Sequence, residues 1–234
     1  MSYFSRISIK SGALAALEGG LDAGDAYRDH TLIWRLFPDS PDKAPRDFLF
    51  RAASAASGTL LYYLVSQRQP QSWHPLVTVN SKPFQPRLET GEWVDFSLRA
   101  NPTVAIASAP DQRGKRHDVL MHAKILARQA GLQGESLQQA IRQAALAWLD
   151  KRAASWGLQI DPDQIQADGY CQHVLRSKGR ELRFSSVDYQ GMARVQDPER
   201  LTQAMLGQPL PGKNASLGHA QAFGCGLLLV KRLA

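Results

Sequence analysis

Apolar and polar residues alternate at the start of the chain, where the odd positions from 3 to 9 fall on one face. This period of two predicts a strand. Glycines between positions 19 and 24 then interrupt the pattern. A helical stripe of apolar residues follows from Asp25 to Phe37, and Pro38 ends it. The opening order is therefore strand, loop, helix.

The rest of the first half contains three β-prone runs. Phe48–Ala53 and Thr59–Val65 are separated only by positions 54–58, which favours an antiparallel pair. A further extended segment is predicted within His74–Phe84. No second helix is visible between these runs. The first half thus has most of the strand and helix order of a ferredoxin-like unit.

The second half shows the full order of strand, helix, two strands, helix, strand. Its clearest helix is predicted to begin at Ser136, with Gln139 at the spacing of a capping box. Lys178 and Gly179 have the composition of a hairpin tip. The other predicted elements, all extended except the helix at 198–206, are Trp93–Ala100, Val104–Ala107, Tyr170–Val174, Arg183–Val195, Pro198–Leu206 and Leu227–Val230.

These patterns predict an α+β fold made of two tandem ferredoxin-like (RRM-like) domains, each with an antiparallel sheet. We place the domains at residues 1–90 and 91–234. A length of 234 residues suits two small domains. Pairs of ferredoxin-like domains commonly bind RNA because they offer broad concave surfaces. Fold alone, however, does not identify a function.

The charge balance points to a polyanionic partner. Lys and Arg outnumber Asp and Glu by 28 to 21, which gives a net charge of +7 and a pI near 9.6. Charge does not distinguish RNA, DNA and anionic lipid. The amino terminus lacks the apolar core of a secretory signal, and no run is long enough to span a membrane. A soluble, cytoplasmic protein without a membrane partner is expected.

Two basic segments are candidate RNA contacts. The first is a predicted loop with Arg113, Lys115 and Arg116. A basic hairpin can reach phosphates along an RNA groove, whereas an ordinary exposed turn more often mixes both signs, as Glu181 does in part here. Both interpretations are open for the second segment, the predicted hairpin, whose basic residues are Arg176, Lys178, Arg180 and Arg183.

One face of the first helix carries groups suited to phosphodiester chemistry. Tyr27, His30 and Trp34 lie together at the border of the apolar stripe, and Arg35 continues round the polar side. A histidine can move a proton to or from a hydroxyl or a leaving oxygen, and an arginine can stabilise phosphoryl charge. No metal or other cofactor is needed if the nucleophile is a ribose 2′-OH. The alternative is that His30 only packs at the helix edge.

Other chemistries have weaker support. The carboxylates near His30 have no matching acidic cluster for a two-metal nuclease, and His117 and His122 lack further ligands for a metal site. Cys171 and Cys225 lie far apart without ligand spacing, which predicts two buried small apolar side chains. No Gly-x-Ser-x-Gly elbow is present for a serine hydrolase.

A glycine-rich loop precedes the last predicted strand. Gly218, Gly224 and Gly226 can adopt positive φ and let a bulky partner approach the main chain. A dinucleotide-binding fingerprint needs its glycines between a strand and a following helix, and here the loop precedes a strand. The alternative to a ligand-binding loop is a simple turn that feeds the final strand.

Taken in order, five segments resemble the CasE-type CRISPR RNA-processing endoribonucleases of type I-E systems. The resemblance covers nearly the whole chain, and the ordered set is far more specific than any single member. The segments are Tyr27–Pro38, Phe96–Pro102, Gly114–His117, Phe184–Gly191 and Ala222–Leu229.

The resemblance implies two ferredoxin-like domains that bind the hairpin of a CRISPR repeat RNA and cut once, without metal, at the 3′ base of its stem. The family then keeps the product and joins other Cascade subunits. His30 matches the catalytic histidine and Tyr27 the tyrosine before it, and Arg35 is expected to stabilise the phosphate. The hairpin Arg176–Arg183 matches the element that enters the stem groove, and the three loop glycines match the family's glycine-rich loop.

The chain departs from the family in this loop. The family loop commonly reads Gly-Ile-Gly followed by basic residues two apart, whereas this chain has Ser216–Gln221 with no Lys or Arg. Lys213, or His219 when protonated, could compensate. Two hypotheses follow: a metal-independent endoribonuclease, and a non-catalytic scaffold that binds an RNA hairpin. Cleavage separates them, because both predict salt-sensitive RNA binding.

Overall fold

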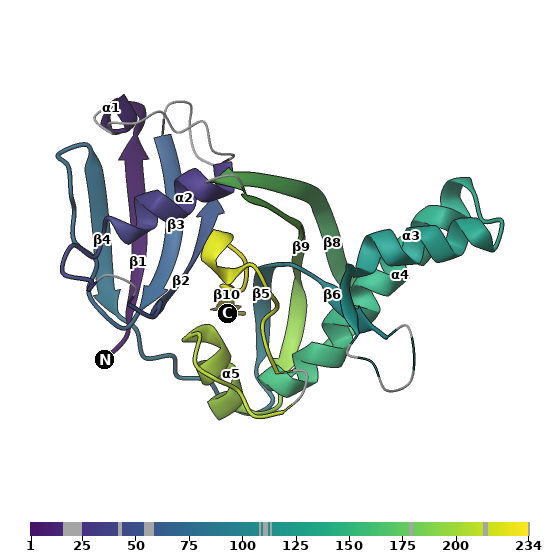
Figure 1. Cartoon of the computed structure of the whole chain (residues 1–234). Helices are drawn as coiled ribbons and strands as arrows, with labels where there is room; N and C mark the ends of the chain where they lie inside the picture. Colours follow the sequence, from purple (N-terminus) through teal and green to yellow (C-terminus); the bar gives the residue numbers. More distant parts are fainter. Residues whose placement is uncertain are drawn as a thin grey trace.

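The computed structural model contains two four-stranded antiparallel sheets with helices packed on them (Figure 1). The predicted mixture of helices and antiparallel sheets is therefore confirmed. The structure describes residues 1–15, 25–41, 44–53, 59–107, 109, 112, 114–177, 180–212 and 215–233.

The first sheet has the order β2-β3-β1-β4. Its strands are β1 (Tyr3–Lys10), β2 (Phe48–Ala53), β3 (Thr59–Ser66) and β4 (Val77–Pro83). Between β1 and β2 lie α1 (Ser11–Ala15) and α2 (Asp25–Trp34). In Figure 1, α2 crosses one face of this sheet. Its apolar side buries Leu32 and Ile33 in a core with Ile7, Phe50 and Leu64, so the helix is held by side chains from three strands.

The second sheet has the order β10-β5-β9-β8. Its strands are β5 (Trp93–Ala100), β8 (Leu158–Ser177), β9 (Arg180–Val195) and β10 (Leu228–Arg232). Strands β8 and β9 form a long hairpin that rises beyond the sheet toward the start of α2 in Figure 1. The core of this half is built around Trp156, Leu149 and Tyr189, which are fully buried.

Between β5 and β8 the chain makes a small hairpin and then two antiparallel helices that project away from the first sheet (Figure 1). The elements are β6 (Thr103–Ile106), β7 (Lys115–Asp118), α3 (Val119–Gln129), α4 (Gly134–Ala153) and the short 3₁₀ turn η1 (Ala154–Trp156). Helix α5 (Pro198–Met205) follows β9, and a second 3₁₀ turn, η2 (Gln221–Phe223), precedes β10. The second half thus contains the predicted order of strand, helix, two strands, helix and strand, with the β6–β7 hairpin and one more helix inserted after β5.

The two sheets pack against each other through one continuous core. Leu49 and Val65 of the first sheet belong to the same apolar cluster as the second-half core. Beside it, Arg51 donates to Ser97 Oγ over 2.6 Å and pairs with the carboxylate of Asp188 at 3.3 Å. Asp188 also receives two bonds of 2.8 Å from Arg99. Both apolar burial and a charged network therefore fix the relative positions of the halves.

Several details of the sequence prediction were wrong. Helix α4 begins at Gly134 with Gln133 as its N-cap, so Ser136 lies inside the helix and no capping box forms. Helices α1 and α3 were missed. The first is only five residues long, whereas the second has an apolar stripe, with Leu120 and Ala127 buried, that the sequence analysis overlooked.

Part of the segment predicted as a basic loop is a β-strand. Lys115 and Arg116 belong to β7, where they pair with Ile106 and Ala105 of β6. The β-ladder therefore holds their backbone in extended form. Cys225 is buried as predicted, but Cys171 is exposed because it lies where β8 extends beyond the packed part of the sheet.

Candidate active site

Helix α2 gathers three of the predicted aromatic groups on one face. The His30 ring lies 6.2 Å from the Tyr27 ring and 6.3 Å from the Trp34 ring, measured between centroids. The next turn of the same helix buries Leu32 and Ile33, which fixes the helix rotation and keeps His30 at the rim of the core. The expected shared face is thus present in the structure.

The glycine-rich loop reaches this histidine from the other end of the chain. The Nδ1 atom of His30 lies 2.9 Å from the carbonyl oxygen of Ala222, in η2. A carbonyl can only accept, so Nδ1 carries the proton and donates. The neutral ring then has its lone pair on Nε2, which fixes the tautomer that a general base requires.

The environment of His30 favours its neutral form. Burial is the main cause that lowers the pKa of His30, the Ala222 hydrogen bond raises it, and the positive charge of Arg46 lowers it. Because burial outweighs the hydrogen bond, the net pKa lies below the ordinary value. An unprotonated Nε2 is therefore available near neutral pH.

The loop keeps η2 in place through left-handed backbone conformations. Gly224 has φ +86° immediately after η2, and Ala220, which is not a glycine, has φ +55° immediately before it. Gly218 and Gly226 have φ values of +98° and +88°, as the sequence suggested they could. Gly218 also packs tightly, since an added Cβ would lie 3.3 Å from the Asn101 carbonyl oxygen.

An aromatic stack joins the loop to the β8–β9 hairpin. Phe223 lies 5.6 Å from the His30 ring and stacks on Phe184 of β9 at 5.5 Å. Phe184 in turn stacks on His173 of β8 at 4.4 Å. The outer part of the hairpin, the loop and α2 are thus held together by one continuous set of rings.

Two hollows each contain one partner of the hydrogen bond between His30 and Ala222. One, of about 660 Å³, runs along α2 and contains Tyr27, His30 and Arg35. The other, of about 670 Å³, lies between the hairpin and the glycine-rich loop and includes Ala222 in its wall. A strand of polyanion that occupied both would pass His30.

The second hollow brings together several predicted RNA-binding residues. Arg116, Arg183, Gly218 and His219 all line it. Arg116 Nη1 lies 3.5 Å from His219 Nδ1. Burial, Arg116 and Arg152, in that order, lower the pKa of His219, so this ring resists protonation and is a poor substitute for a fixed charge.

The remaining predicted residues are not gathered there. Lys115 is exposed on β7, and Gly224 and Gly226, at the end of the glycine-rich loop, are buried. Arg176 and Arg180 lie on β8 and β9, whose backbone alone the structure describes at these positions. Arg113, Lys178 and Lys213 lie outside the described residues, as does the predicted hairpin tip.

Arg35 lies beside His30 but also has an aromatic partner. Its guanidinium carbon lies 5.5 Å from the centre of the Trp73 ring, and its side chain is exposed. It lines the hollow along α2 with Tyr27 and His30. The three predicted catalytic residues are therefore brought together on one surface.

Sequence reasoning missed Arg46, which lines the second hollow and donates from Nη2 to Gln221 Oε1 over 2.8 Å. It is a single basic residue just before β2, outside both basic segments. No local pattern marked it, and only the folding of the glycine-rich loop onto this segment places it in the site.

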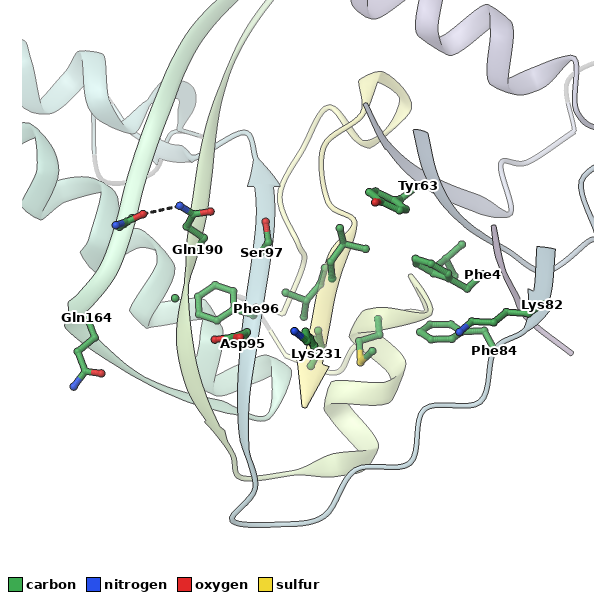
Figure 2. A pocket seen from close by; sticks show the side chains of 17 residues that line it. Phe4, Tyr63, Lys82, Phe84, Asp95, Phe96, Ser97, Gln164, Gln190 and Lys231 are labelled. Atoms are coloured by element: carbon green, nitrogen blue, oxygen red, sulfur yellow. Dashed lines mark hydrogen bonds between the residues drawn. The ribbon is translucent and has the colours of Figure 1, made fainter. Parts of the chain in front are cut away.

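A third hollow, of about 870 Å³, lies between the two sheets (Figure 2). Figure 2 shows Phe4, Tyr63 and Phe84 from the first half facing Phe96 and Lys231 from the second. It contains no histidine and none of the predicted site residues. The predicted catalytic residues lie instead in the hollow along α2.

No group of three or more His, Cys, Asp or Glu side chains that could hold a metal ion is present within the part of the chain that the structure covers. The His117 and His122 rings lie 6.0 Å apart. Among the described helices, none combines the length and apolar character needed to cross a membrane.

Residues 2–232 match the family described as "CRISPR associated protein", which is nearly the entire chain. The chain belongs to this family. The resemblance suggested by the five ordered segments is thereby confirmed. Within this CRISPR-associated family, the chain is 23% identical to the CRISPR system Cascade subunit CasE of Escherichia coli (strain K12) over 205 residues, 87% of this chain and 90% of CasE.

A second similar protein is the CRISPR-associated endoribonuclease Cse3 of Thermus thermophilus. It is 27% identical to this chain over 147 residues, 58% of each protein. The structure of Thermus thermophilus Cse3 bound to an RNA representing a pre-cleavage complex has a TM-score of 0.66 with 19% identity, and the match covers 99% of this chain and 100% of that one. Cas6e from Escherichia coli has a TM-score of 0.62 with 22% identity, at the same coverage. The family fold therefore extends over the whole molecule.

Proposed function

We propose that this chain is an endoribonuclease that binds the stem-loop of a CRISPR repeat RNA, cuts it at the 3′ base of the stem and stays bound to the mature product within Cascade. The names of two relatives, a Cascade subunit and an endoribonuclease, support this proposal. So does the similarity in fold to Cse3 bound to RNA. The observation that carries it is the His30–Ala222 hydrogen bond, which places a histidine of fixed tautomer between two hollows.

The proposed architecture is a pair of ferredoxin-like domains, residues 1–90 and 91–234. When the strands of each half are numbered along the chain, both sheets have the spatial order 4-1-3-2. Strands β5, β8, β9 and β10 with α3, α4 and α5 form the complete β-α-β-β-α-β unit. In the first half, the described residues 67–76 contain no second helix.

The proposed RNA surface follows the β8–β9 hairpin into the hollow beside the glycine-rich loop. Arg183 is exposed at the hairpin, and Arg116 lines the same hollow. Arginine donors placed along a groove suit the phosphates of an RNA stem. The other residues proposed for this surface are Arg113, Lys115, Arg176, Lys178, Arg180, Lys213, Gly218, His219, Gly224 and Gly226.

The proposed reaction is attack by the ribose 2′-OH on the adjacent phosphorus. A bond forms between O2′ and phosphorus, the bond from phosphorus to O5′ breaks, and the products are a 2′,3′-cyclic phosphate and a 5′-OH. The proton of the 2′-OH must leave and O5′ must gain one. Nε2 of His30 can accept the first proton or, once charged, donate the second. Tyr27 orients the reacting groups and Arg35 contributes positive charge.

This route requires no metal ion, because the nucleophile is part of the substrate and the proton and charge are handled by side chains. The test is to incubate the purified protein in excess EDTA with its repeat hairpin. A matched hairpin carries a 2′-deoxy sugar at the nucleotide before the cut. We expect cleavage of the first RNA only. Tight binding with neither RNA cut would instead favour the non-catalytic scaffold.

A further inference from the structure

Arg46 is held in the candidate active site without an acidic partner. Its Nη2 donates to the side-chain oxygen of Gln221 over 2.8 Å. Its Nη1 is buried, and no group in the described part of the chain accepts a hydrogen bond from it. No carboxylate of a described residue forms an ion pair with it. The guanidinium therefore has one neutral acceptor and one unsatisfied nitrogen.

Such an arrangement is costly for the free protein. An unpaired buried donor is unfavourable, and more so when the group is charged. Burial lowers the pKa of Arg46, yet a guanidinium remains protonated at any pH of interest. A fork of donors on a fixed cation matches the geometry of phosphate oxygens. An incoming phosphate would satisfy Arg46 better than Gln221 does.

The position of Arg46 relates it to His30. Arg46 contacts Gln221, and His30 contacts the next residue, Ala222. The two groups thus approach consecutive residues of η2, and the Arg46 charge is close enough to lower the pKa of His30. A phosphate within reach of His30 Nε2 would lie in the field of this guanidinium.

The loop itself supplies no fixed positive charge. Residues 215–226 include no lysine or arginine, and the neighbours of His219 oppose its protonation. Arg46 comes from a segment more than a hundred residues away and lines the same hollow as this loop. It supplies a fixed positive charge directly at η2, where the loop has none of its own.

We propose that Arg46 is a further catalytic residue, which binds a non-bridging oxygen of the scissile phosphate and stabilises the charge that accumulates there during cleavage. The proposal rests on the proposed ribonuclease function. Nη1 is buried in the free protein, so it cannot reach a phosphate as the side chain stands. When RNA binds, the guanidinium therefore rotates away from Gln221 and toward the phosphate. It thereby exchanges a neutral hydrogen bond for charge-assisted ones, which are about twice as strong.

The main alternative is that Arg46 only clamps the loop through Gln221. Three variants separate the two roles. Arg46→Met removes the charge and the donors, Arg46→Lys keeps the charge without the fork, and Gln221→Leu removes the clamp while leaving Arg46 intact. Single-turnover cleavage of the repeat hairpin is measured with saturating protein in EDTA. Affinity is measured separately with the uncleavable 2′-deoxy hairpin.

We expect Arg46→Met to lose about 100-fold or more in the single-turnover rate, the usual effect of removing one donor to a transition-state oxyanion. Its affinity for the 2′-deoxy hairpin should change by less than about tenfold, near the effect of one phosphate contact. Arg46→Lys should retain part of the rate. Gln221→Leu should stay within about threefold of the wild type, because catalysis does not use the bond it removes.

Equal losses in Arg46→Met and Gln221→Leu would overturn the proposal in favour of the clamp, and so would a wild-type rate in Arg46→Met. If Arg46→Met fails to fold, Arg46→Lys decides: a wild-type rate rejects the need for a fork of donors. His30→Ala serves as the reference for the reaction itself. A wild-type protein that binds the hairpin but never cleaves it would end both the ribonuclease proposal and the Arg46 proposal. If His30→Ala loses cleavage while the Arg46 variants keep it, only the Arg46 proposal ends.

Discussion

The His30 imidazole donates a hydrogen bond of 2.9 Å to the carbonyl oxygen of Ala222, a residue 192 positions away in the sequence. This single contact joins the first helix to the glycine-rich loop near the end of the chain. It also decides which ring nitrogen keeps its lone pair. The proposed proton transfer by His30 would therefore depend on the position of a loop in the other half of the molecule.

Replacement of His30 by alanine should lower cleavage by roughly 10²- to 10⁴-fold, the range associated with a lost general acid or base. RNA affinity should be nearly unchanged, because the phosphate-binding groups remain. His122→Ala on α3 is the matched control and should cleave at the wild-type rate. An unaltered rate in His30→Ala, measured at saturating protein, would remove His30 from the mechanism.

The ring of His30 should titrate below 6.5, its ordinary pKa, because burial outweighs its hydrogen bond to Ala222. Arg46→Met should raise this midpoint, since one source of positive potential is lost. The measurement is NMR of the ring carbon–hydrogen groups in the RNA-free protein across pH 4–8. A midpoint at or above 6.5 in the wild type would contradict the prediction.

The lowered pKa of His30 also makes the free energy of unfolding depend on pH. The folded state holds a proton on His30 less readily than the unfolded chain, so the unfolded state binds more protons just below pH 6.5. The contribution of this residue to stability is thus present above pH 6.5 and is lost as pH falls through the folded pKa. His30→Gln should flatten this acidic decline in urea unfolding midpoints measured as a function of pH.

Gly224→Ala should impair the site through the backbone. Gly224 has φ +86°, while an added Cβ would lie 3.5 Å from its nearest neighbour, an atom of the Phe50 ring, so space is available and strain is the main penalty. We expect about 1–2 kcal/mol of lost stability and slower cleavage, because Ala222 shifts away from His30.

Gly131→Ala is the matched control for this effect. Gly131 has φ +80° in the turn between α3 and α4, and no atom lies within 4 Å of its added Cβ. It should lose similar stability without losing cleavage at a temperature where both variants are folded. Equal cleavage by the two variants would show that the loop conformation at Gly224 does not matter for the reaction.

Asp188→Asn should weaken the packing of the two halves. Asp188 accepts two bonds of 2.8 Å from Arg99 and pairs with Arg51 at 3.3 Å. Removing its charge leaves two partly buried guanidinium groups opposed, at a cost of about 2 kcal/mol in the free energy of unfolding. Urea denaturation measures this. The pair of Arg232 and Glu92, in which the arginine is exposed, is the control, and Arg232→Gln should cost less than about 1 kcal/mol.

Arg183→Ala tests the proposed RNA surface through its salt dependence. Arg183 is exposed at the hairpin and lines the hollow beside the loop. If it contacts one phosphate, the slope of log affinity against log salt should fall by about 0.7–0.9. Arg128→Ala on α3 should leave the slope unchanged. Identical slopes for wild type and Arg183→Ala would remove this residue from the interface.

The sequence by itself determined most strands, the main helices and the shared face of His30, Tyr27 and Trp34. These features arise from local periodicity, because side chains two apart in a strand or three to four apart in a helix lie on one side of the element. The sequence also indicated that the loop glycines can adopt positive φ, because the absence of a Cβ is a property of the residue alone.

Two elements were read incompletely from the local pattern. The apolar stripe of helix α3, which packs mainly on α4 and buries Leu120 and Ala127, was overlooked. The full extent of β8, from Leu158 to Ser177, includes two register shifts that obscure alternation.

Only the tertiary structure brought Ala222 to His30 and Arg46 to Gln221. Both contacts join segments far apart in the chain, through a main-chain carbonyl in one case and an isolated arginine in the other. Neither group carries a sequence signal, because every residue has a carbonyl and a single arginine on the surface is common. Their roles arise from packing of the two halves, which places the loop against α2 and the segment before β2.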